Sequence, residues 1–251
     1  MISVVYVNYN EAEKLEKSFQ TIKNFAQEIV VLDLGSSDHT KEVCKKFNVK
    51  LLKHEKVEYV ELVRNYAISK ANGDWILVLD PDEEISLKLR STLEDITKQD
   101  KFVAVNIPRK NIFLNKLISH TNWWPDKHIR FFRRGAVHWN KKIHSYPNVD
   151  GNVLDLGANE NLAIIHFGYH SLSDFIERQN KYSGIEAENL FSIGERFSYF
   201  KLIWKPIREF LVRYIKHAGF LDGFYGFALT FLMMIYQIEI MIKLWEREKQ
   251  N

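Results

Sequence analysis

Apolar and polar positions in the first hundred residues alternate between two periods, one typical of buried strands and one of amphipathic helices. Four short apolar runs predict strands, over residues 2–7, 29–32, 49–52 and 75–79. The segments between them predict helices, over about residues 11–24, from the turn at 35–38 to 47, and 60–71. This βαβα order predicts an α/β fold with a mainly parallel, doubly wound sheet.

The pattern continues to about residue 190 with less regular spacing. We expect a helix over 86–98, strands over 102–107, 129–132 and 163–166, and a helix over 171–190. Ser171 and Asp174 resemble a capping box at the start of the last helix. The stretch 110–126 between these elements is aromatic and is expected to be irregular.

The last sixty residues differ in composition. Aromatic and basic residues interleave over 197–217, and no charged residue occurs over the 16 residues 223–238. Because a helix needs about 20 apolar residues to cross a bilayer, this run favours a helix that lies in the membrane plane or joins two copies. A helix packed on the preceding domain is the alternative. We therefore predict a domain over 1–192 and a helical appendage over 193–251.

Composition narrows the choice of class and compartment. The chain has 251 residues, 46% of them hydrophobic, so a packed core is expected. Its net charge of +3 gives no indication of a nucleic-acid partner. The single cysteine, Cys44, excludes an intrachain disulfide and a multi-cysteine zinc site, and fits a cytoplasmic setting. The N-terminus lacks the pattern of a signal peptide.

Carboxylates follow the most strongly apolar of the predicted strands. Asp80, Asp82 and Glu83 come directly after the run 75–79. Two carboxylates one residue apart on a turn suit a hard divalent cation that also holds a diphosphate. An ordinary acidic turn is the alternative. Asn8 and Asp33 also stand at strand ends, where ligands bind in doubly wound sheets, so we expect a site there.

Five sequence blocks occur in a specific order, and together they identify a resemblance. They are Val7–Glu11, Val30–Thr40, Arg64–Ala67 with Gly73–Trp75, Leu79–Glu83, and Trp124–Asp126 with Ile129–Arg134. In this order they resemble glycosyltransferase family two, which has the GT-A fold. The last block resembles the bacterial branch that extends lipopolysaccharide cores and related surface glycans. The resemblance covers about residues 1–190 and implies that 1–192 is a GT-A-like nucleotide-sugar glycosyltransferase domain.

The resemblance implies how the donor is bound. Asn8, Tyr9 and Asn10 would line the base pocket, and Asp33 would accept a hydrogen bond from the base, as a carboxylate can from the imide N–H of uracil. Arg64 would lie near the nucleotide and Asp80 near its ribose or the metal. The alternative for Asp33 is a turn-forming residue, and the alternative for Arg64 is a partner in a helix-surface ion pair.

The metal and its ligands are also implied by the resemblance. Asp82 would ligate Mg²⁺ or Mn²⁺, whose charge would neutralise the leaving nucleoside diphosphate. A further ligand is often supplied late in this fold, and His166, at the end of the last strand, is our candidate. A core histidine with a satisfied hydrogen bond is the alternative for His166.

The general base is where the sequence departs from the family pattern. Branch members tend to have His-Glu where this chain has His144-Ser145. Asp126 or His144 would then accept the proton of the acceptor hydroxyl, while a turn-capping Asp126 is equally open. Arg130, Arg133 and Arg134 are candidates for binding the diphosphate or an acidic acceptor, and at least one is expected to be solvated surface.

These expectations combine into one function. We predict a metal-dependent inverting glycosyltransferase that moves a sugar from a nucleoside diphosphate donor, expected to be UDP-linked, to a lipopolysaccharide core or related glycan. The enzyme would act at the inner face of the cytoplasmic membrane, with a membrane or homo-oligomer contact through residues 197–245. A nucleotidyltransferase is the alternative enzyme, although residues 1–20 lack the glycines of a phosphate loop. An inactive membrane-associated nucleotide-sugar-binding protein, suggested by Ser145, is the alternative of another class.

Overall fold

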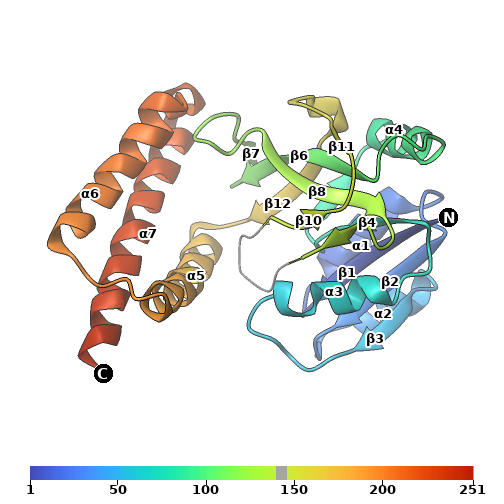
Figure 1. Cartoon of the computed structure of the whole chain (residues 1–251), viewed down its shortest axis with the longest axis horizontal. Helices are drawn as coiled ribbons and strands as arrows, with labels where there is room; N and C mark the ends of the chain where they lie inside the picture. Colours follow the sequence, from blue (N-terminus) through green and yellow to red (C-terminus); the bar gives the residue numbers. More distant parts are fainter. Residues whose placement is uncertain (140–145, 251) are drawn as a thin grey trace. The chain divides into compact units, whose positions relative to one another are not determined.

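The computed structural model describes residues 1–139 and 146–250, which fall into two compact units. The first unit comprises Met1–Arg109 and Asp126–His166, and the second comprises Lys110–Pro125 and Phe167–Asn251. Figure 1 shows the elements of both. Neither compact unit begins or ends at residue 192. The domain boundary expected there stays a prediction.

A mixed sheet, with parallel and antiparallel strand pairs, forms the centre of the first unit. Four strands pair in parallel in the order β3-β2-β1-β4: β1 (Ile2–Asn8), β2 (Glu28–Asp33), β3 (Lys50–Lys53) and β4 (Trp75–Val78). The sheet continues in the order β8-β6-β12-β5: β5 (Glu83–Ile85), β6 (Ala104–Phe113), β8 (Asp126–Arg133) and β12 (Ile164–Tyr169). β8 is antiparallel to both β4 and β6, so the predicted parallel, doubly wound order holds for the first four strands.

Short strands complete the pairing. β11 (Val153–Asp155) runs parallel to β6, whereas β9 (Val137–His138) and β10 (Asn148–Val149) form a separate antiparallel pair. β5 was missed by the sequence analysis, because its three residues directly follow the acidic turn. It pairs antiparallel with β12, and His166 lies opposite Glu83 in that pairing.

Helices cover both faces of the parallel strands, as alternation along β1 requires. Val4 and Tyr6 pack in one apolar cluster with α1 (Ala12–Ile22), whereas Val5 packs in another with α3 (Glu61–Ser69). α2 (Thr40–Lys46), α4 (Leu87–Thr97) and the 3₁₀ turn η1 (Glu160–Leu162) complete the unit. Successive residues of a strand point to opposite faces, so a strand buried on both sides reads as an unbroken apolar run.

Helices dominate the second unit. They are α5 (Leu172–Ser192), α6 (Tyr199–Phe210), the π-helical turn η2 (Leu211–Lys216), the 3₁₀ turn η3 (Gly219–Asp222) and α7 (Gly223–Lys249). The unit also holds the hairpin of the β6 end with β7 (Lys116–Leu117), within the stretch expected to be irregular. α7 packs against both α5 and α6 (Figure 1).

Two local features fix these helices. The Ser171 hydroxyl accepts a hydrogen bond from the backbone N–H of Asp174 at 3.0 Å, which confirms the predicted cap of α5. Gly226 brings α7 close to η3, because a β-carbon at this position would lie 1.8 Å from the carbonyl oxygen of Gly219.

α7 is longer than its uncharged run. The segment Gly219–Lys249 contains the one helix, within the described residues, that is long and apolar enough to cross a membrane by length and composition. Length therefore does not exclude a membrane span for α7, contrary to the expectation from the 16-residue uncharged run. The helix continues through Glu239 and Lys243, which are good helix formers and have partners on α5. The Ser183 hydroxyl lies 2.9 Å from Glu239, and the Asn180 side chain 2.6 Å from Lys243.

Candidate functional site

Three polar residues lie together at the carboxyl ends of adjacent strands, as the sequence predicted. Asn8 ends β1 and lies opposite Asp33, which ends β2, and Asp80 follows β4 on the other side of β1. Asn8 is buried, and its Nδ2 donates to the Thr40 hydroxyl at 3.0 Å. Its Oδ1 is buried without a hydrogen-bond partner among the described residues, so the amide retains an acceptor.

The turn after β2 is closed by Asp33. Its carboxylate accepts the Ser36 backbone N–H at 3.1 Å and the Ser36 hydroxyl at 2.5 Å, around Gly35 with φ of +83°. The turn-forming interpretation of Asp33 is therefore what the structure shows, and its contact with a nucleotide base stays a prediction.

Asn10 and Tyr9 border this turn. Asn10 has a positive φ of 54°, and its Oδ1 accepts the backbone N–H of Ser37 at 2.8 Å. The Tyr9 ring is partly exposed, with the Lys56 ammonium 4.0 Å from its centroid. The two residues thus flank an accessible surface beside the strand ends, and their role in base binding stays a prediction.

The acidic segment after β4 folds back on itself. The Asp80 backbone N–H donates to the Glu83 carboxylate at 2.9 Å, and the Glu83 N–H donates to the Asp80 carbonyl at 3.0 Å. Glu83 is fully buried, while the Asp80 side chain is 30% exposed. This reciprocal pair fixes the turn through Pro81 and Asp82 at the edge of the sheet.

Three arginines converge on Asp80 and Glu83. Arg130 Nη2 lies 2.8 Å from Asp80 and 3.1 Å from Glu83, and Arg64 lies 3.6 Å from Asp80. Burial alone would raise the pKa of Asp80, but Arg130 and Arg64 outweigh it and hold that pKa well below its ordinary value. Arg109 Nη1 reaches Glu83 at 3.2 Å.

Arg130 differs from the two other arginines considered with it. It is buried, and its Nε and Nη1 have no hydrogen-bond partner among the described residues. Arg133 pairs with Asp100 at 2.7 Å, and the Arg134 backbone N–H donates to Asp74, the residue before β4. Arg133 and Arg134 thus belong to the opposite end of β4 from the acidic segment, so neither is placed to bind a diphosphate there.

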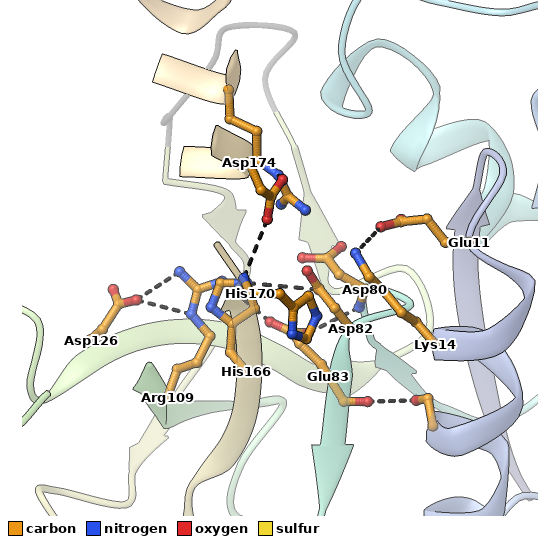
Figure 2. A network of polar contacts seen from close by, with 12 residues as sticks. Glu11, Lys14, Asp80, Asp82, Glu83, Arg109, Asp126, His166, His170 and Asp174 are labelled. Atoms are coloured by element: carbon orange, nitrogen blue, oxygen red, sulfur yellow. Dashed lines mark hydrogen bonds and ion pairs between the residues drawn. The ribbon is translucent and has the colours of Figure 1, made fainter. Parts of the chain in front are cut away.

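Asp82 faces a different environment from Asp80 (Figure 2). It is 7% exposed, and its Oδ1 lies 3.7 Å from His166 Nε2. Burial, followed by the negative charges of Asp80, Glu11 and Glu83, raises the pKa of Asp82 to about 7. A positive charge beside this carboxylate would favour its ionised form.

His166 complements Asp82 as a possible metal ligand. Burial, then the charge of Arg109, lowers its pKa well below the ordinary value, so the ring is neutral. Neutral imidazole nitrogen and carboxylate oxygen are both common ligands of divalent cations, so this pair fits such an ion. No group of three or more His, Cys, Asp or Glu side chains able to hold a metal occurs in the described part of the chain. Two protein ligands would leave positions for phosphate oxygens and water.

Asp126 is held on both of its oxygens. Oδ2 accepts from Arg109 Nε at 2.9 Å and Nη2 at 2.7 Å (Figure 2). Oδ1 lies 2.8 Å from His128 Nε2. Burial lowers the pKa of His128, which favours the neutral ring as the donor to Asp126. His144, the other candidate base, lies outside the described residues, so both base assignments stay predictions.

Glu83, Arg109 and His128 also belong to this cluster and were not predicted from the sequence. Glu83 was visible in the acidic block but received no role. Its full burial depends on β5 pairing with β12, which the local pattern does not show. The sequence does contain one indication of the cluster. Glu83 is a charged residue within a strand, and later strands carry the arginines that could pair with it.

Comparisons with known proteins find similarity to glycosyltransferases. The family model described as Glycosyl transferase family 2 matches residues 3–149. A Rickettsia felis protein named an uncharacterized glycosyltransferase is 27% identical over 243 residues, covering 90% of this chain and 83% of its own. The lipopolysaccharide core biosynthesis glycosyltransferase LpsC from Rhizobium meliloti is 24% identical over 254 residues, covering 98% and 92%.

A solved structure supports the fold. A mannosyltransferase from Pyrobaculum calidifontis, in complex with GDP-Man and Mn²⁺, superposes with a TM-score of 0.56 over 97% of this chain and 86% of its own. Sequence identity is 12%, so the likeness concerns the fold. It confirms the predicted α/β, GT-A-like class with helices at the C-terminus.

Proposed function

The chain belongs to glycosyltransferase family 2, and we propose that it transfers a sugar, with inversion, from a nucleoside diphosphate donor to a glycan hydroxyl. Membership confirms the predicted family and the prediction of a glycosyltransferase, and it argues against a nucleotidyltransferase. The Rhizobium relative favours a lipopolysaccharide core or related surface glycan as acceptor. The GDP-Man and Mn²⁺ in the Pyrobaculum structure favour a nucleotide-sugar donor and a divalent cation.

The pairing of Asp82 with His166 is the observation on which this proposal rests. A buried carboxylate with a raised pKa, 3.7 Å from a neutral imidazole, is a suitable pair of ligands for Mg²⁺ or Mn²⁺. The cation would supply positive charge to the leaving nucleoside diphosphate. Asp80 is engaged by Arg130 and Arg64, so it is better suited to orient those arginines and the ribose.

The donor's base would lie over the ends of β1 and β2. Asn8 retains a buried acceptor, Tyr9 offers a partly exposed ring, and Asn10 and Asp33 shape the adjoining turn. We keep UDP as the proposed nucleotide, since a carboxylate such as Asp33 can accept the imide N–H of uracil.

Activation of the acceptor hydroxyl is assigned to Asp126 or His144. Asp126 has two partners that fix its orientation, which suits a base that must meet a hydroxyl in one geometry. Its pairing with Arg109 makes it a weaker acceptor, which favours His144. Parallel turnover measurements on Asp126→Asn and His144→Ala distinguish them, because loss of a general base lowers kcat by roughly 10²- to 10⁴-fold.

Location at the inner face of the cytoplasmic membrane is also proposed. It would place the enzyme where lipid-linked glycans are extended. The segment 197–245 would provide the contact with a membrane or with a second copy.

The central test measures binding of UDP- and GDP-sugars by calorimetry, with Mn²⁺ and after chelation. We expect binding that requires the cation and weakens at least about tenfold in Asp82→Asn, a change of about 1.4 kcal/mol. Asp95→Asn is the matched control, since Asp95 lies on the exposed surface of α4. Tight binding that survives both chelation and Asp82→Asn would refute the proposed site.

Slow release of free sugar from the donor separates an active enzyme from an inactive binding protein. We expect hydrolysis of the bound donor in the absence of acceptor, and its loss in Asp82→Asn. Donor binding with no release of sugar, with or without glycan acceptors, would favour the inactive binding protein suggested by Ser145.

A further inference from the structure

The continuous helix of α6 and η2 exposes an apolar stripe. Phe200, Ile203, Ile207 and Leu211 recur every three or four residues and are all exposed, Phe200 to 72% and Ile203 to 64%. Residues at this spacing lie on one side of a helix. Soluble proteins seldom expose so many large apolar side chains together, so this side is expected to have a partner.

α7 extends the same surface. Phe227 and Phe231 are exposed, and their rings contact Tyr214 at 6.3 Å and Phe210 at 6.0 Å between centroids. These ring contacts place the exposed aromatic residues of α7 beside the helix of α6 and η2. We call the surface formed by Phe200, Ile203, Ile207, Leu211, Phe227 and Phe231 the outer apolar face.

Basic residues border the outer apolar face. Lys205 and Arg208 lie on α6 and Lys216 on η2. Glu195, which pairs with Lys201, lies near enough to Lys205 for that lysine to lower its pKa, whereas Arg208 and Lys216 are exposed and form no ion pair among the described residues. The acids of the segment 199–238 are Glu209, which pairs with Arg213, and Asp222, which pairs with His120. The border therefore carries more positive than negative charge.

We propose that the outer apolar face docks in the plane of a membrane whose surface carries anionic lipid headgroups. Aromatic and aliphatic side chains would enter the boundary between headgroups and acyl chains, while Lys205, Arg208 and Lys216 meet lipid phosphates. The charge distribution favours this occupant over a second copy of the chain. A symmetric dimer would bring two borders of net positive charge together.

The polar contacts between α7 and α5 argue against α7 crossing the membrane. Tyr236 donates a hydrogen bond to Glu186 of α5 at 2.7 Å. Glu239 accepts one from Ser183 of α5, and Lys243 donates one to Asn180 of the same helix. A spanning α7 would carry α5 and its charged residues into the hydrocarbon, which is costly. Lying in the plane keeps these polar contacts out of the acyl region.

Co-flotation of the full chain with lipid vesicles tests the proposal without donor or acceptor. We expect binding to phosphatidylcholine vesicles that contain phosphatidylglycerol, much weaker binding to phosphatidylcholine alone, and weakening by salt. Ile203→Glu should reduce binding at least tenfold. Leu87→Glu is the matched control, because Leu87 is 73% exposed on α4 in the first unit and receives the same change.

A second pair of variants tests the basic border separately. Lys205→Gln with Arg208→Gln should weaken binding to anionic vesicles by about 30-fold, at about fivefold for each residue. Lys41→Gln with Lys45→Gln, two exposed lysines of α2, should change it less than twofold. Both pairs remove the same net charge, so a difference between them reports position.

Three results would overturn the proposal. One is absence of vesicle binding by a chain that is monomeric in light scattering. The other is a dimer that Ile203→Glu dissociates, in a chain that does not float with vesicles, which would assign the face to a second copy. Equal flotation of the Ile203→Glu and Leu87→Glu variants would likewise exclude the outer apolar face as the contact. Each readout is independent of sugar transfer.

Discussion

Removing the charge of Glu83 should destabilise the first unit more than any single change at its surface. The Glu83 carboxylate is fully buried and is shared by Arg109, Arg130 and the backbone N–H of Asp80, at 3.2, 3.1 and 2.9 Å. Glu83→Gln keeps the size of the side chain but leaves the guanidinium groups of buried Arg130 and half-buried Arg109 with one fewer counter-charge.

The expected cost follows from these distances. At about 3 Å and an effective dielectric constant of about 20, the gross attraction to each guanidinium is about 5 kcal/mol. Desolvation offsets part of it, and Arg109 and Arg130 keep Asp126 and Asp80 as partners. Loss of one partner of a buried ionic cluster costs about 3–5 kcal/mol, so we expect a loss in this range in the free energy of unfolding.

Denaturant-induced unfolding, monitored by circular dichroism and tryptophan fluorescence, measures this difference. Glu84→Gln is the matched control, because Glu84 lies next along β5, is partly exposed and has no ion pair among the described residues. We expect the control within about 0.5 kcal/mol of the wild type. If Glu83→Gln also stays within that margin, the buried cluster does not hold the fold as argued.

Two further predictions concern stability. Phe131→Ala should lower the free energy of unfolding by about 3–5 kcal/mol, because Phe131 is fully buried and stacks on Trp75 at 4.8 Å, whereas exposed Tyr146→Ala should be nearly neutral in the same denaturation assay. Burial raises the pKa of Asp38, but hydrogen bonds from Thr40 and the backbone outweigh it and lower that pKa. This stabilisation is complete above the unfolded pKa of about 3.9 and is lost as pH falls through the folded value, so wild type should lose more stability than Asp38→Asn between about pH 6 and pH 3 in urea titrations. Parallel pH profiles of the two proteins would contradict this.

The parallel half of the fold could be predicted because its signals are local. Each strand from β1 to β4 is a short apolar run, and each is followed by a polar residue or turn. The order of elements along the chain then places Asn8, Asp33 and Asp80 at one edge of the sheet.

The arginine cluster could not be predicted in the same way. Glu83 meets Arg109 and Arg130 across 26 and 47 positions of sequence, and these meetings depend on β8 lying antiparallel between β4 and β6. No periodicity within a window of sequence encodes that placement. Likewise, the end of α7 could not be located from charge alone, since Glu239 and Lys243 are good helix formers and the helix continues through them to Lys249.

The acids of the segment Asp80–Glu83 differ in their charged neighbours and in the direction of their pKa shifts. Arg64, Arg109 and Arg130 neutralise Asp80 and Glu83, and they hold the pKa of Asp80 down. Asp82, on the turn between them, faces His166 and keeps a raised pKa of about 7. A cation beside Asp82 would offset the negative charges of Asp80, Glu11 and Glu83, which together with burial raise its pKa. This division supports Asp82, rather than Asp80, as the proposed metal ligand, with the arginine-bound acids as its rigid support.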